Sequence, residues 1–97
     1  MKTTNEYITH MRCYMDRNSK RLGIKSMGIF GSVARGEQND DSDLDVFVDL
    51  ETPSYHTLCR IKEELEELCR CDVDIVRLRP SLRPLLQKRI QEDGITI

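Results

Sequence analysis

The sequence predicts an α/β (α+β) fold in which a small mixed β-sheet is covered by helices. Residues 4–21 and the segments that begin near 53 and 81 repeat apolar side chains at the three- and four-residue spacing of amphipathic helices. Residues 24–30, 43–50 and 72–78 are short apolar or alternating runs of the kind that form strands. Since the two kinds of segment alternate, one sheet with helices packed on it is the simplest arrangement.

Length and charge limit the function classes. The 97 residues suit a single domain over 1–97, and Lys+Arg 15 against Asp+Glu 17 gives a net charge of −2. That balance argues against direct nucleic-acid binding through a basic surface. No apolar run approaches the roughly 20 residues that span a bilayer, and residues 1–6 lack a signal-peptide pattern. We expect a cytoplasmic protein with no membrane association and with reduced cysteines.

The helix ends carry recognisable signals. Thr3 and Glu6 have the spacing of a capping box, and Gly23 is a natural C-terminal stop. For the later helices, we expect Thr52 and Pro53 to begin the second, Ser81 to cap the last, Gly94 to end it, and residues 95–97 to add a short edge strand.

The four cysteines do not form a zinc pattern. Cys69 and Cys71 are separated by one residue, and Cys13 and Cys59 fall at apolar positions of predicted helices. Small buried side chains are the favoured interpretation, with a metal or redox role as the alternative.

Gly31 and Ser32 follow the first predicted strand directly. Glycine lets the backbone approach a ligand closely, and the amides and hydroxyl of such a turn can hold phosphate oxygens. The pair is weak evidence by itself, because turns favour these residues in general.

Asp43 and Asp45 are placed two residues apart in the second predicted strand. Residues i and i+2 of a strand share a face, so both carboxylates converge on one small volume, where hard oxygen ligands suit Mg²⁺. A polar outer strand face is the plainer alternative. An EF-hand is excluded, because Val46 stands where that loop needs glycine and Thr52 where it needs glutamate.

Asp74, on the third predicted strand, completes the candidate set. If that strand lies beside the second, Asp74 joins Asp43 and Asp45, and three carboxylates could hold two metal ions and place a base near a hydroxyl. Asp72 is a less favoured candidate. The basic residues near the C-terminus are expected mainly at a solvated helix face, although some could meet a triphosphate or an acidic partner: Arg77, Arg79, Arg83, Lys88 and Arg89.

The combined pattern resembles a known family. Residues 31–36, Gly-Ser-Val-Ala-Arg-Gly, followed by Ser42-Asp43-Leu44-Asp45 and by residues 73–76, are similar to the minimal nucleotidyltransferase (MNT) family of the DNA polymerase β-like superfamily. The resemblance covers essentially the whole chain and implies a polymerase β-like nucleotidyltransferase core.

The resemblance also implies roles for single residues. Gly31 and Ser32 would hold the β,γ-phosphates of a nucleoside triphosphate, and Asp43, Asp45 and Asp74 would be both catalytic and metal-binding. Arg35 would touch phosphate or brace the loop. The implied reaction is transfer of NMP, with ATP as the expected donor of AMP and two Mg²⁺ ions as cofactor, to a hydroxyl acceptor with release of pyrophosphate.

The implied partner is a protein. Because this length leaves no room for an acceptor-gripping helical domain, the acceptor is expected to be recognised through a partner or an oligomer. Family resemblance points to an antitoxin that adenylylates a HEPN-domain toxin. The alternatives are a non-catalytic subunit that silences its partner by docking, and nucleotidylation of a small molecule with a helical partner subunit.

Overall fold

The structure is a computed structural model that describes residues 2–97. A four-stranded sheet forms the centre of the molecule. The spatial order is β3-β2-β1-β4. β1 lies antiparallel to β2 and to β4, whereas β2 and β3 are parallel, so the sheet is mixed as predicted. The strands are β1 (Ile24–Phe30), β2 (Leu44–Leu50), β3 (Val73–Arg77) and β4 (Ile95–Thr96).

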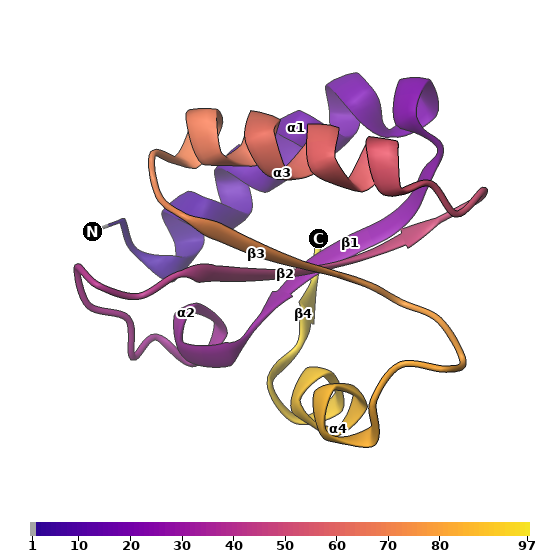
Figure 1. Ribbon diagram of the computed structural model, residues 1–97. Helices are drawn as coiled ribbons and strands as arrows, with labels where there is room; N and C mark the ends of the chain where they lie inside the picture. Colours follow the sequence, from indigo (N-terminus) through magenta and orange to yellow (C-terminus); the bar gives the residue numbers. More distant parts are fainter. Residues whose placement is uncertain (1) are drawn as a thin grey trace.

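Helices lie on both sides of this sheet. The helices are α1 (Thr4–Leu22), α2 (Gly31–Arg35), α3 (Tyr55–Cys69) and α4 (Pro84–Asp93). α1 and α3 cover one face together, α4 lies on the opposite side, and the short α2 continues directly from the end of β1 (Figure 1). Among residues 2–97, no helix combines the length and the apolar character needed to cross a bilayer.

The main core fills the space between the sheet and the helix pair. It joins buried side chains of α1 and α3 to the even-numbered positions of β2, which include Leu44, Val46 and Val48. Odd-numbered positions of β2 face the other way, where the ring of Phe47 lies 6.3 Å from that of Phe30. Both rings are almost fully buried. The predicted polar face of β2 is therefore partly covered.

The first helix and strand follow the sequence prediction closely. The Thr3 hydroxyl accepts a hydrogen bond from the Glu6 backbone N–H, and the Glu6 carboxylate accepts one from Thr3 N–H, which completes the capping box. Gly23 ends α1 with a left-handed φ of 67°. β1 then spans residues 24–30 as expected.

Two predicted helix starts are wrong, and proline explains the second of them. α3 begins after Ser54, whose hydroxyl accepts from Thr57 N–H at 3.2 Å, and Thr52 is not its cap. α4 begins at Pro84 and is not capped by Ser81. A proline disfavours helical geometry at the residue before it, and Arg83 is accordingly extended with ψ 136°.

Several predicted positions shift within the elements. β2 begins at Leu44, so Asp43 precedes the strand and does not belong to it. Cys13 is exposed and does not occupy the core, whereas Cys69 takes a buried position at the end of α3. All four cysteines are free thiols.

Candidate active site

Gly31, at the junction of β1 and α2, allows the chain to pass very close to a carboxylate. Its φ of 73° lies in the left-handed region that side chains disfavour. A Cβ at this position would collide with the Asp45 carboxylate and would lie 3.5 Å from Nη2 of Arg89. Only glycine therefore brings the Gly31–Ser32 turn against Asp45.

The three predicted carboxylates lie at neighbouring positions of the sheet. Asp45 of β2 is the register partner of Phe30 on one side and of Asp74 on the other. Asp43 stands two residues before Asp45, immediately outside β2. Asp43 and Asp74 are exposed, whereas the side chain of Asp45 is only 19% exposed. The structure thus places Gly31, Asp45 and Asp74 together, with Asp43 at the rim.

The electrostatics of Asp45 reflect this crowding. Burial raises the pKa of Asp45 above its ordinary value, and the charges of Asp74 and Asp43 raise it further. The guanidinium groups of Arg89 and Arg35 act in the opposite direction without cancelling the rise. The site therefore carries excess negative charge that a cation would relieve.

This donor set fits a divalent cation only with help from other ligands. Carboxylate oxygens are the ligands that Mg²⁺ prefers, and Mg²⁺ commonly takes one or two of them together with phosphate oxygens and water. Within residues 2–97, no three His, Cys, Asp or Glu side chains form a group that could hold a metal ion. A bound nucleotide would have to supply the remaining oxygens.

The Arg35 guanidinium pairs with two protein carboxylates. Its Nε donates to Glu37 at 3.0 Å, and its Nη1 donates to Asp93 of α4 at 2.7 Å. The second of these bonds ties α2 to the last turn of α4. In this structure the Arg35 guanidinium thus links α2 to the following loop and to α4.

Arg89 lies at the site, and the sequence named it only as one of five basic residues near the C-terminus, some of which could meet a triphosphate. Its Nη2 lies 3.9 Å from Oδ2 of Asp45, and its Cζ lies 5.6 Å from the centre of the Phe30 ring. The available signal was its position on α4, because Arg89 falls on the stripe formed by Leu86, Ile90 and Asp93 at helical spacing.

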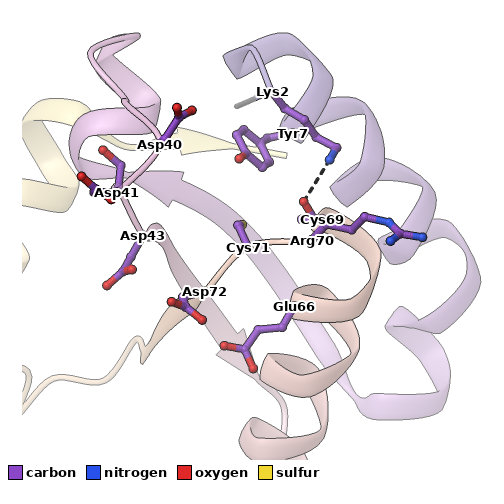
Figure 2. Close-up of a pocket in the computed structure, with 11 residues that line it drawn as sticks. Lys2, Tyr7, Asp40, Asp41, Asp43, Glu66, Cys69, Arg70, Cys71 and Asp72 are labelled. Carbon is purple, nitrogen blue, oxygen red and sulfur yellow. Dashed lines mark hydrogen bonds between the residues drawn. The ribbon is translucent and has the colours of Figure 1, made fainter.

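An acidic pocket of about 750 Å³ adjoins the site at Asp43. Figure 2 shows it between the start of α1, the segment before β2 and the end of α3, with Lys2 donating to the Cys69 carbonyl at 3.0 Å. Its carboxylates are Asp40, Asp41, Asp43, Glu66 and Asp72. Lys2 and Arg70 also line the pocket, so five carboxylates face two basic side chains there.

Solved structures share this architecture. A structure provisionally described as a minimal nucleotidyltransferase is similar with a TM-score of 0.78 and 33% identity over 99% of this chain and 97% of that chain. A toxin–antitoxin structure with AMP-PNP has a TM-score of 0.75 at 24% identity, over 91% and 69%. A Shewanella oneidensis complex of a tri-AMPylated HEPN toxin with an MNT antitoxin has a TM-score of 0.60 at 21% identity, over 96% and 66%. The last two likenesses concern the fold alone.

Curated relatives match the full length. A Methanocaldococcus jannaschii protein, provisionally named a protein adenylyltransferase, is 35% identical over 100% of both chains. Protein adenylyltransferase MntA of Thermococcus cleftensis is 32% identical over 100% of this chain and 98% of its own. The family described as polymerase beta, nucleotidyltransferase matches residues 15–97. With this match and these relatives, the chain belongs to the polymerase β nucleotidyltransferase family.

Proposed function

We propose that this chain is a Mg²⁺-dependent protein adenylyltransferase that transfers AMP from ATP to a hydroxyl of a partner protein and releases pyrophosphate. The observation that carries the proposal is the contact between the Gly31 turn and Asp45, with Asp74 beside it in register. This arrangement brings the backbone of the Gly31–Ser32 turn against carboxylates whose charge a cation would offset. The names of the full-length relatives support a protein acceptor.

The residues divide into two groups. Gly31 and Ser32 would receive the β,γ-phosphates, because only the glycine backbone leaves room beside Asp45. Asp43 and Asp45 would hold the cation together with phosphate oxygens. When bound, Mg²⁺ supplies charge neutralisation on the phosphates and on the leaving pyrophosphate.

Asp74 would act on the acceptor side. It lies on β3, which is the edge strand next to β2, and its side chain is exposed. An acceptor hydroxyl can therefore reach it from outside the sheet. The Asp74 carboxylate would orient that hydroxyl and take its proton as the oxygen attacks the α-phosphorus in line.

Arg35 would keep the Gly31–Ser32 turn in place. Its bonds to Glu37 and Asp93 join the loop after α2 to α4, on the side of the sheet where the nucleotide would enter. We assign it a bracing role in nucleotide binding, because both ends of its guanidinium already have carboxylate partners.

The proposed partner is a HEPN-domain toxin protein. Support comes from the complexes that share this fold, one of which holds an AMPylated HEPN toxin with an MNT antitoxin. In this view the chain is an antitoxin that silences its toxin by covalent modification.

The test uses ATP labelled at the α-phosphate, Mg²⁺, the purified chain and a candidate HEPN protein, or host lysate. We expect label on one protein band. The double variant Asp43→Asn with Asp45→Asn should give no labelled band, because neutral amides replace both carboxylates that are proposed to bind the cation. ATP labelled at the γ-phosphate should leave every band unlabelled, since pyrophosphate carries that label away.

The outcomes separate the alternatives. A labelled small molecule would overturn the protein acceptor but retain nucleotidyl transfer. Silencing of the partner by the double variant, with no label in any sample, would show that the chain acts by docking. Label that survives in the double variant would remove Asp43 and Asp45 from the mechanism.

A further inference from the structure

The guanidinium of Arg89 lies where the Gly31–Ser32 turn meets the carboxylate of Asp45. It lies 3.9 Å from Asp45, 5.6 Å from the centre of the Phe30 ring, and 3.5 Å from the point where a side chain on Gly31 would begin. Phe30 and Asp45 are register partners in the sheet, and Gly31 follows Phe30 directly at the start of α2. One cation thus touches all three parts of the site.

Arg89 is held less firmly than Arg35. Arg35 has two ion pairs, at 3.0 and 2.7 Å, whereas Arg89 has one ion pair within the part of the chain that the structure describes, at the outer limit of such contacts. The side chain of Arg89 is also 44% exposed. Its guanidinium can therefore change partner while its stem stays on α4.

We propose that Arg89 is a phosphate-binding residue that exchanges partners: it neutralises Asp45 in the empty site and moves onto the triphosphate when a divalent cation takes its place on Asp45. The proposal rests on the proposed function and names a further residue for the same site.

The chemistry of the group supports this exchange. A guanidinium offers a planar fork of donors that matches phosphate oxygens, and it can stay stacked on an aromatic ring while its donors turn. Phe30 provides that ring beside Gly31. The cation and Arg89 would compete for the Asp45 carboxylate, yet both would attract the triphosphate. Removing Arg89 should therefore affect metal binding and nucleotide binding in opposite directions.

The test measures the two bindings separately in Arg89→Ala, Arg89→Lys and a control, Lys88→Ala. Lys88 stands next to Arg89 on α4 but is 71% exposed and pairs with Glu92. Mn²⁺ binding without nucleotide is followed by electron paramagnetic resonance. Binding of α,β-methylene ATP, which cannot transfer AMP, is measured by calorimetry with Mg²⁺. Circular dichroism confirms that each variant is folded.

For Arg89→Ala, we expect Mn²⁺ to bind about two- to fivefold more tightly, as for the loss of a competing surface ion pair. The nucleotide analogue should bind about tenfold more weakly, as for the loss of a charged hydrogen bond. Arg89→Lys should keep Mn²⁺ binding near that of the wild type and give an intermediate nucleotide affinity. Lys88→Ala should change neither.

Mn²⁺ binding that is unchanged or weaker in Arg89→Ala would overturn the exchange. Unchanged nucleotide affinity would remove Arg89 from the phosphate site. If the wild-type chain itself did not bind the analogue, the proposed function would fail first, so the two failures are distinguishable.

Discussion

Asp45 on β2 and Asp74 on β3 are register partners in neighbouring parallel strands, and Asp45 also faces the Gly31 turn at the end of β1. Two like charges at adjacent strand positions destabilise a sheet unless a cation offsets them. The repulsion between Asp45 and Asp74 is therefore an unfavourable feature of the sheet, and such features are typical of binding and catalytic sites.

The first prediction follows from the raised pKa of Asp45. A carboxyl with a higher pKa in the folded state than in the unfolded state costs stability when ionised. That cost is present above the folded pKa and disappears as pH falls below the ordinary value of 3.8. Asp45→Asn should therefore raise the Tm at pH 7, and the gain should vanish near pH 3. Thermal unfolding from pH 3 to 8 measures it.

Asp49→Asn is the matched control for this prediction, because Asp49 is on the same strand with its side chain 37% exposed beside Lys25. It should not raise the Tm. A lower Tm for Asp45→Asn at pH 7 would show that the Arg89 ion pair outweighs burial and repulsion.

A second prediction concerns two glycines with the same backbone angle. Gly31 and Gly36 both have φ of 73°, but a Cβ on Gly36 would meet only Thr4 Oγ1 at 4.0 Å. Gly36→Ala should lower the free energy of unfolding by about 1–2 kcal/mol, because alanine disfavours the left-handed conformation. Gly31→Ala should cost more and abolish nucleotide binding, because its Cβ collides with Asp45. Urea unfolding and analogue binding give the two readouts, and equal costs would refute the close approach.

A third prediction concerns the bond between Arg35 and Asp93. Their side chains are 41% and 19% exposed, so solvent screens the pair only in part. A double-mutant cycle with Arg35→Ala and Asp93→Ala should give a coupling energy of about 0.5–1 kcal/mol that falls in high salt. Zero coupling at low salt would contradict the bracing role.

The elements themselves could be predicted from local patterns. The Thr3–Glu6 box, the Gly23 stop and the alternation in residues 44–50 are short-range signals, and the structure confirms each. One of the two misplaced helix starts could also have been avoided. Pro84 restricts Arg83 before it, so the last helix could not begin directly after Ser81.

The site was predictable only in part. The spacing of Gly31, Asp43, Asp45 and Asp74 marks candidates, but the register that sets Asp45 beside Asp74 depends on how three separate strands pair. The location of Arg89 depends on α4 crossing the sheet, which is a tertiary contact without a local signal. Cys13 was misplaced because helical spacing alone does not say where the apolar stripe ends.

The final prediction separates the cysteines by reactivity. Burial, with the neighbouring Cys71 charge, raises the pKa of Cys69 to about 11, and the residue is 1% exposed. Thiolate is the reactive form, so Cys69 should react with a disulfide reagent at pH 8 about a hundredfold more slowly than an ordinary exposed thiol. Cys13, which is exposed, should give the fast phase, and Cys13→Ser should remove it. All four thiols should react quickly in urea. A fast reaction of Cys69 in the folded protein would mean that the end of α3 opens readily, and the acidic pocket that it lines would then be a transient feature of the surface.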